Sequence, residues 1–248
     1  MRLIPCALVI AALARAESLE EWRLEATISL QATLHHVQGI DLEGNRLWVS
    51  SVERNARKGY LSLFELPGGR LVRQIELQEG DQFHPGGIAR QGDWIWVPVA
   101  EYRRSSSATI QKRHKASLKL LDSFPVADHI GCIAAGGGQL IGGNWDSRVF
   151  YVWDERGKLL AKWDNPRPTG YQDLKRMGAT LIGSGLLSRR EGAIEWLALP
   201  GFTLSKQVLT GVTDRGLPYT NEGMAFVGGK LYLLPEDNPS RLFVFAPR

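Results

Sequence analysis

The segment His84-Pro-Gly-Gly-Ile88, followed by the apolar run Trp94-Ile-Trp-Val97, decides the fold because related segments recur along the chain. Each copy has a five-residue marker and then an apolar run, and the copies follow one another at roughly 40 to 50 residues. The markers are His36-Val-Gln-Gly-Ile40, His84-Pro-Gly-Gly-Ile88, His129-Ile-Gly-Cys-Ile133, Gly170-Tyr-Gln-Asp-Leu174 and Thr220-Asn-Glu-Gly-Met224. Self-similarity at a fixed period is the sequence signature of a repeat architecture.

Each repeat has the pattern of four short strands joined by turns. A glycine stands at the same place after every marker, where it supplies the positive φ that a tight hairpin requires. No segment shows a convincing helical periodicity, and short strands at regular spacing are typical of propeller blades. The sequence therefore predicts an all-β fold, a five-bladed β-propeller of four-stranded antiparallel blades.

The two ends of the chain indicate how the ring closes. The fifth repeat stops after its third strand, Leu242–Phe245, and a surplus strand, Trp22–Leu30, precedes the first marker. We expect this N-terminal strand to join the last blade, because closure hides sheet edges that would otherwise favour aggregation.

The first residues have the pattern of a secretory signal peptide. Residues 1–16 comprise a charged start, a short apolar run and the small-x-small sequence Ala14-Arg15-Ala16. We therefore expect a periplasmic or secreted protein with one propeller domain over 17–248, and no integral membrane segment. Removing 1–16 also removes Arg2 and Arg15, which lowers the formal net charge from +4 to +2, so the basic pI gives no reason to expect nucleic-acid binding.

The mature chain keeps a single cysteine, Cys132, which excludes an intrachain disulfide. A core stabilised by packing alone, in a monomer, is the expected state.

Propeller geometry predicts where the markers meet. Each marker begins an innermost strand, and the loops between second and third strands emerge at the same end of the central channel, where pockets usually form. The candidate ligand-binding residues at this mouth are His35, Gln38, Arg104, Asp128, Asn144, Trp145, Arg190, Asn221 and Glu236. Arg104 and Arg190 belong to a series of basic residues that precede the third strands. Such a series either attracts an anionic ligand or consists of strand-end charges paired with nearby carboxylates.

The histidines at the first marker position suggest a metal site. His36, His84 and His129 come from contiguous blades, and Glu222 comes from the blade that closes the ring beside His36. Imidazoles with one carboxylate suit a divalent transition metal, zinc or iron, and an open position would admit water or substrate. Glu222 is also the candidate catalytic residue, although it stands out of phase with the histidines. The alternative is that the histidines only form hydrogen bonds with neighbouring blades or channel water.

The segments His35-His-Val-Gln-Gly-Ile40, His84-Pro-Gly-Gly-Ile88 and Asn221-Glu-Gly-Met-Ala225 resemble those of poorly characterised exported bacterial propellers. The chain is more distantly similar to the gluconolactonase and paraoxonase propellers. That resemblance implies metal-dependent ester or lactone hydrolysis at the channel mouth. Those families have six blades and bind calcium, whereas this chain has five repeats and histidines at the mouth.

Two functions of different class follow from the sequence. The first is a propeller that binds a small or anionic ligand, or a protein partner, on the histidine-lined mouth. The second is a metal-dependent hydrolase or lyase in which the ion lowers the pKa of bound water and Glu222 is a ligand or the general base.

Overall fold

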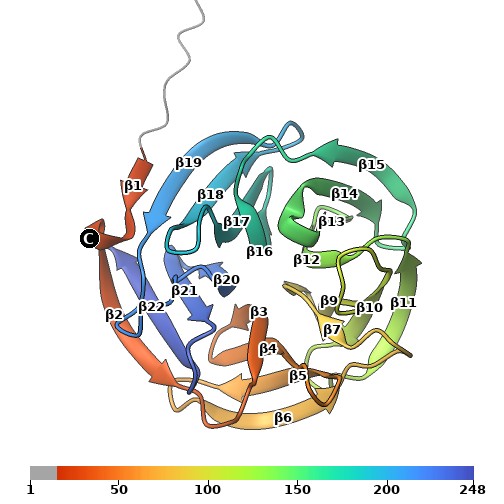
Figure 1. Cartoon of the computed structure of the whole chain (residues 1–248), viewed down its shortest axis with the longest axis horizontal. Helices are drawn as coiled ribbons and strands as arrows, with labels where there is room; N and C mark the ends of the chain where they lie inside the picture. The colour runs from red at the N-terminus through yellow and green to blue at the C-terminus, as the bar shows by residue number, and fades with distance from the viewer. Residues whose placement is uncertain (1–15) are drawn as a thin grey trace, which may run out of the picture.

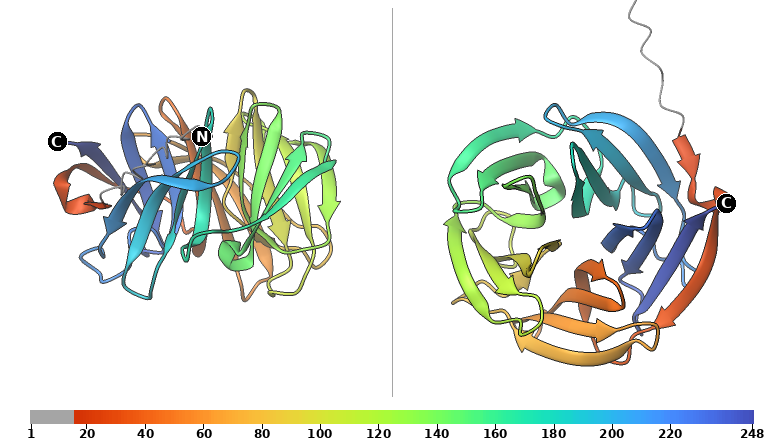
Figure 2. Two further views of the ribbon diagram at one scale, coloured as in Figure 1. Left: turned by 90° about the horizontal axis from the view of Figure 1, so that it is seen from above. Right: turned by 180° about the vertical axis from the view of Figure 1, so that it is seen from behind.

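A computed structural model describes residues 16–248, and these residues form a closed ring of five β-sheets around a central axis (Figure 1). The predicted five-bladed, all-β propeller is confirmed. Seen from above, the blades stand side by side in a flat ring (Figure 2). The predicted signal peptide lies outside the described residues except for Ala16, which begins β1 (Ala16–Ser18). Within residues 16–248, no helix has the length and apolar character needed to span a membrane.

Blades one to three each begin at a marker near the axis and end at the outer rim. The strands of the first are β3 (His36–Glu43), β4 (Arg46–Glu53), β5 (Lys58–Glu65) and β6 (Arg70–Glu76). Those of the second are β7 (His84–Pro85) and β8 (Ala89–Gln91), then β9 (Trp94–Ala100), β10 (Ala108–His114) and β11 (Leu120–Val126). Those of the third are β12 (Ile130–Gly136), β13 (Gln139–Asn144), β14 (Val149–Asp154) and β15 (Leu159–Asp164).

Blades four and five take in the N-terminal strands. The fourth contains β16 (Gly170–Met177), β17 (Thr180–Leu186), β18 (Gly192–Ala198) and β19 (Thr203–Thr210), with β1 added in parallel outside β19. The fifth contains β20 (Glu222–Val227), β21 (Lys230–Pro235), β22 (Arg241–Pro247) and β2 (Trp22–Ser29). Leu24 pairs with Phe245 and Ile28 with Leu242, so the predicted closure by the N-terminal strand is confirmed. The pairing of β1 with β19 was not foreseen.

The hairpin glycines show why one residue type recurs in every repeat. They have φ values between +58° and +59°, a conformation that a residue with a Cβ adopts at a cost. They are Gly44, Gly92, Gly137, Gly178 and Gly228.

The hydrophobic core lies between the blades. Each of the five buried clusters combines residues of two neighbouring sheets; one, for example, joins Val37 and Phe64 of the first blade to Leu234 and Leu242 of the fifth. The ring is therefore held by apolar contacts between blades, and the axis is left to polar groups.

Candidate functional site

The fourth residue of each marker lies at the axis and fills the channel below the mouth. In three blades it is glycine, and a Cβ on Gly39 would lie 2.4 Å from Gly87 Cα. In the fourth blade it is Asp173, which is fully buried. The glycines leave room for this carboxylate, since a Cβ on Gly87 would lie 2.8 Å from Asp173 Oδ1.

Asp173 accepts hydrogen bonds from three blades. Its Oδ2 accepts from the backbone N–H of Ile40 and of Met224, both at 3.0 Å. Its Oδ1 accepts from Leu174 N–H at 2.9 Å and from Lys175 Nζ at 2.5 Å. Burial raises the pKa of Asp173 to about 6, against the opposing effect of Lys175 and these N–H donors, so the carboxylate is ionised at neutral pH.

Lys175 extends the same network to the second blade. Its Nζ donates to Ile88 O at 2.8 Å and to Leu174 O at 3.1 Å. The Asp173–Lys175 ion pair thus connects the innermost strands of four blades and forms a floor across the channel.

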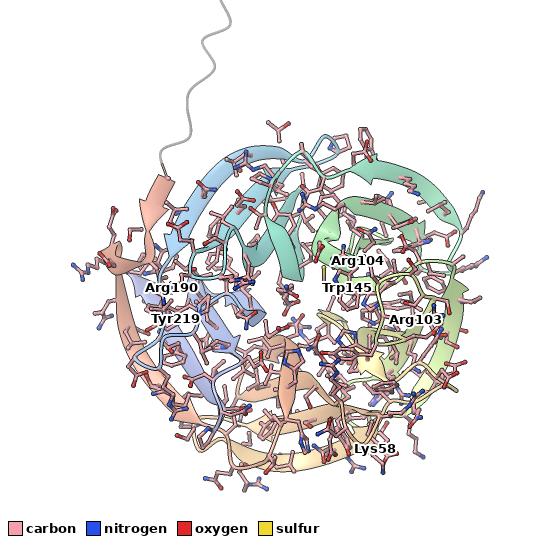
Figure 3. All side chains as sticks on the ribbon, in the orientation of Figure 1. Lys58, Arg103, Arg104, Trp145, Arg190 and Tyr219 are labelled. Carbon is pink, nitrogen blue, oxygen red and sulfur yellow. The ribbon has the colours of Figure 1, made fainter. Side chains whose placement is uncertain are left out.

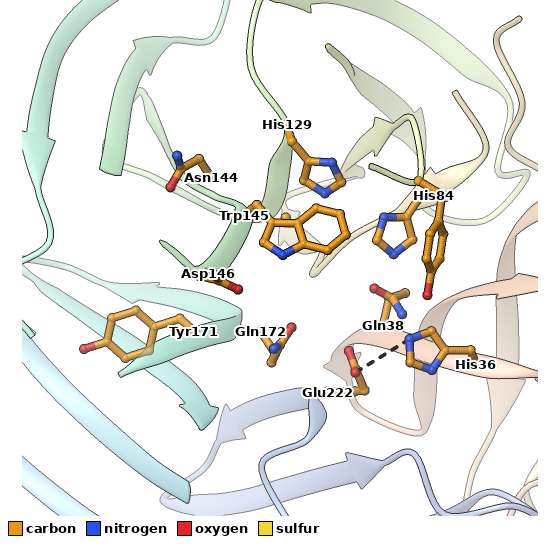
Figure 4. Close-up of a pocket in the computed structure, with 12 residues that line it drawn as sticks. His36, Gln38, His84, His129, Asn144, Trp145, Asp146, Tyr171, Gln172 and Glu222 are labelled. Carbon is orange, nitrogen blue, oxygen red and sulfur yellow. Dashed lines mark ion pairs between the residues drawn. The ribbon is translucent and has the colours of Figure 1, made fainter. Parts of the chain in front are cut away.

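Above this floor lies a polar cavity of about 190 Å³ at the end where the markers begin (Figure 4). The side chains and backbone segments that line it belong to His36, Gln38, His84, Tyr102, His129, Gly131, Asn144, Trp145, Asp146, Tyr171, Gln172 and Glu222. The predicted meeting of the three marker histidines with Glu222 at one mouth therefore agrees with the structure.

Irregular pairing brings both the first and the third marker residues to this cavity. The register shifts at Gln38, Gly131 and Gln172, and such bulges redirect side chains and are frequent beside active sites. Glu222 is also a third marker residue, and it lines the same cavity as His36. Glu222 therefore lines the cavity together with the histidines although it stands out of phase with them in the marker.

Glu222 is the most unusual residue of the cavity. The residue is 5% exposed, and its ion-pair partner His36 Nε2 lies 3.8 Å away, beyond hydrogen-bond distance. Its backbone has φ +113°, which costs a residue with a Cβ roughly 1–3 kcal/mol. Burial raises the pKa of Glu222 to about 8, and the neighbouring carboxylates Glu236 and Asp173 add to the rise while His36 opposes it.

His36 is oriented by a second carboxylate. Its Nδ1 lies 2.7 Å from Glu236 Oε1, in the loop that follows β21. Burial lowers the pKa of His36, but Glu236 and Glu222 outweigh it and the net change is a rise. The hydrogen bond from His36 lowers the pKa of Glu236. The two carboxyl groups beside the His36 imidazole thus differ in protonation at neutral pH: Glu222 is neutral and Glu236 is ionised.

The opposite wall is aromatic and uncharged. The ring of His84 lies 4.2 Å from that of Tyr102 and 5.3 Å from that of His129, measured between centroids. Trp145 packs against His129 at 4.5 Å. Burial lowers the pKa of His84 well below its usual value and that of His129 to about 4, so both imidazoles are neutral at neutral pH.

The described residues contain one group of at least three side chains whose arrangement could hold a metal ion. It consists of His36, Glu222 and Glu236, with one potential ligand atom from each, all within 4.8 Å of one another. His84 and His129, which we expected in the ligand set, line the cavity but are not part of this group.

The remaining predicted residues are divided between the cavity and its surroundings. Gln38, Asn144 and Trp145 line the cavity. Glu236 does not line the cavity but pairs with His36, which does. The backbone oxygen of Asn221 accepts a hydrogen bond from Glu236 N–H at 3.0 Å.

Two other predicted residues, Asp128 and His35, lie outside the lining. Asp128 accepts hydrogen bonds from Tyr151 Oη at 2.7 Å and from His129 N–H at 2.8 Å. His35 faces Glu53, with 3.4 Å between Nε2 and Oε2.

The two predicted arginines differ in position. Arg104 pairs with Asp146 at 2.7 Å and lies 5.7 Å from the Trp145 ring, at the rim of the cavity. Arg190 lies on the other side of the ring, away from Trp145 (Figure 3). The alternative that these are strand-end charges fits Arg104, which has a carboxylate partner.

Tyr102 was expected near the channel mouth but was not among the candidate ligand-binding residues, and it forms part of the cavity wall. It lies in the loop between β9 and β10, and its ring packs on His84. The sequence signal that could have indicated its role is an aromatic residue within a polar loop between two strands.

Comparison with one solved structure supports the fold. The structure of glutaminyl cyclase from Myxococcus xanthus superposes with a TM-score of 0.68 at 12% sequence identity, over 90% of this chain and 95% of that one. The computationally designed Ika4 protein matches with a TM-score of 0.46 at 14% identity, over 70% of this chain and 97% of that one. A search of curated proteins finds no match.

These findings do not support the resemblance to gluconolactonases and paraoxonases beyond a propeller fold. A model described as a family of unknown function (DUF6454) matches residues 5–204, more than half of the sequence. The chain therefore belongs to this family of unknown function.

Proposed function

We propose that this protein is an enzyme that binds a small, neutral polar molecule in the histidine-lined cavity and transfers a proton through Glu222. The observation that carries the proposal is the state of Glu222. Its buried carboxyl group forms no hydrogen bond with residues 16–248, sits on strained backbone and faces the cavity. Such a group destabilises the fold, and strained, costly residues concentrate at functional sites.

The two carboxyl groups suit different roles in acid–base chemistry. The neutral Glu222 is a general acid at neutral pH, because burial holds its proton. Glu236 keeps its charge and orients His36 through Nδ1, so that His36 Nε2 lies 3.8 Å from Glu222 Oε1. In this arrangement His36 is the base, Glu236 orients it, and the neutral Glu222 beside it is the acid. Such an arrangement is common in proton transfer.

The charge of the site favours a neutral ligand over the anionic one that the sequence also suggested. The lining residues include no lysine or arginine, and Arg104 at the rim pairs with Asp146. The glutaminyl cyclase with a similar fold is an enzyme by its name, which is consistent with catalysis on such a ring but does not assign a reaction to this chain.

The test is a screen of small neutral amides, esters and lactones for turnover by the mature protein. With the best substrate, Glu222→Gln should bind as the parent does and lose about 10²- to 10⁴-fold in kcat, the range of general acid catalysis. Glu53→Gln is the matched control, because it makes the same change on a carboxylate that pairs with His35 outside the cavity. Full turnover by Glu222→Gln, or an equal loss in both variants, contradicts the proposal.

A second candidate is metal-dependent hydrolysis of an ester or lactone. The observation that favours it is the group of His36, Glu222 and Glu236 within 4.8 Å, with donor atoms that suit zinc or iron. Bound metal would lower the pKa of a coordinated water.

Elemental analysis of protein purified without chelator or a histidine tag tests this candidate. One equivalent of metal that is lost in His36→Ala and kept in His84→Ala supports the group of three. Loss of the metal in both variants supports the set of histidines expected from the sequence. Metal-free protein that retains turnover excludes the candidate.

A further inference from the structure

The two neutral histidines of the aromatic wall differ in which ring nitrogen has a partner. His129 Nδ1 lies 3.1 Å from the backbone oxygen of Arg103 and 3.2 Å from Ser106 Oγ. A carbonyl oxygen only accepts hydrogen bonds, so Nδ1 carries the proton of this imidazole. Its Nε2 is then a lone-pair acceptor at the cavity wall.

His84 has the opposite pattern. Its Nδ1 is buried and has no hydrogen-bond partner among residues 16–248, and the residue is only 8% exposed among Tyr102, His129 and Trp145. A buried N–H without an acceptor is rare because it forfeits its hydrogen bond to water. The proton therefore resides on Nε2, at the far edge of the ring, and Figure 4 shows this edge directed into the cavity.

The wall thus presents one donor and one acceptor side by side. The two ring centroids are 5.3 Å apart, so the two rings are close enough to contact one small ligand. We propose that the substrate of this site is a carboxamide whose carbonyl oxygen accepts from His84 Nε2–H and whose N–H donates to His129 Nε2. The inference rests on the proposed function, since it names the substrate class of the same cavity.

The pattern discriminates between carbonyl compounds. An ester, lactone or ketone would satisfy His84 but leave the acceptor of His129 unpaired in a buried wall. Sites built to pair with a substrate N–H or O–H reject analogues that lack it, because the buried polar group loses its partner. The proposal therefore excludes the ester and lactone substrates of the second candidate function.

The first experiment observes the two protons. Long-range ¹H–¹⁵N spectra of chelator-treated protein with labelled histidines report the tautomer of each ring, with His84→Gln and His129→Gln used for assignment. We expect the proton on Nε2 in His84 and on Nδ1 in His129. The same tautomer in both rings, or a protonated imidazolium at neutral pH, overturns the proposal.

The second experiment uses the lactam pyrrolidone and the lactone butyrolactone, which differ by N–H against ring oxygen. In the Glu222→Gln background, where turnover does not interfere, pyrrolidone should bind at least tenfold more tightly. His84→Phe should weaken both probes about equally, because both present the carbonyl, and His129→Phe should remove the preference for the lactam. His84→Gln, which restores a donor, should recover part of the affinity.

Equal affinity for the two probes, or no binding of the lactam, overturns the carboxamide assignment. Folding of each variant is checked by its amide spectrum, and the tautomers of the parent protein remain decisive if a Phe variant does not fold. If Glu222→Gln keeps full turnover while the lactam preference persists, the acid–base role of Glu222 fails and the substrate class stands.

Discussion

Two buried carboxyl groups lie close to the axis of this propeller and have opposite surroundings. Asp173 accepts four hydrogen bonds and pairs with Lys175, which connects the innermost strands of four blades. Glu222, in the adjacent blade, forms no hydrogen bond within 16–248 through its side chain and sits on strained backbone. The difference separates a carboxylate that stabilises the ring from a carboxyl group that the fold retains at a cost.

The largest effect is expected when the stabilising carboxylate is changed. Asp173→Asn should lower the free energy of unfolding by about 3–5 kcal/mol, because the ammonium of Lys175 would be buried without its counter-charge. Urea denaturation of the protein measures this change in the free energy of unfolding. A loss below about 1 kcal/mol would show that Asp173 does not hold the ring together.

The same chemical change at Glu222 should act in the opposite direction. Glu222→Gln should raise the free energy of unfolding by on the order of 2 kcal/mol at pH 7, because it removes a carboxyl group whose ionisation the fold opposes. The measurement is made on chelator-treated protein, since a bound ion would stabilise the carboxylate. Equal destabilisation by Asp173→Asn and Glu222→Gln would abolish the contrast.

The stability gained by Glu222→Gln should depend on pH, which tests the cost of the Glu222 carboxyl group directly. The pKa of Glu222 rises from an ordinary 4.5 in the unfolded chain to about 8 in the folded protein. The folded state therefore holds a proton that the unfolded state has released, and stability from this group is full below pH 4.5 and is lost as pH rises through 8. The advantage of Glu222→Gln should vanish near pH 4.5, grow by up to about 1.4 kcal/mol per pH unit, and level off above pH 8.

The smallest effect on stability is expected when Glu236, the ionised partner of His36, is changed. Glu236→Gln removes the carboxylate on His36 Nδ1, so the pKa of His36 should fall, with a change in stability within about 1 kcal/mol. An NMR titration of the His36 ring measures the shift. Asp128→Asn, which alters a carboxylate beside His129, is the control and should leave the pKa of His36 unchanged.

The fold was predictable because its signals are local and repeat. A turn glycine imposes its conformation within one hairpin, and the same φ occurs in every blade. The closing strand was visible from its alternation and from the incomplete last repeat. The division of the first strand of blade two into β7 and β8 was not expected, although Pro85 lacks the N–H that a continuous ladder requires.

The axial ion pair and the distribution of partners in the site were not predictable in the same way. Asp173 stands where three other markers have glycine, but its hydrogen bond to Ile40 joins residues 133 positions apart. The meeting of the markers at one mouth follows from the repeat. The choice of Glu236, and not His84, as the neighbour of His36 depends on the path of the loop after β21, which no periodic pattern specifies.

The closure of the ring by β2 also sets an order of events during synthesis. Arg241–Pro247, the partner of β2, is translated after the other four blades, so Trp22–Ser29 waits until these blades have been made. At 5–20 residues per second this delay is on the order of ten to fifty seconds. His36 belongs to the first blade made, and Glu222 and Glu236 belong to the last. The part of the cavity formed by His36, Glu222 and Glu236 therefore cannot assemble until the fifth blade has been translated.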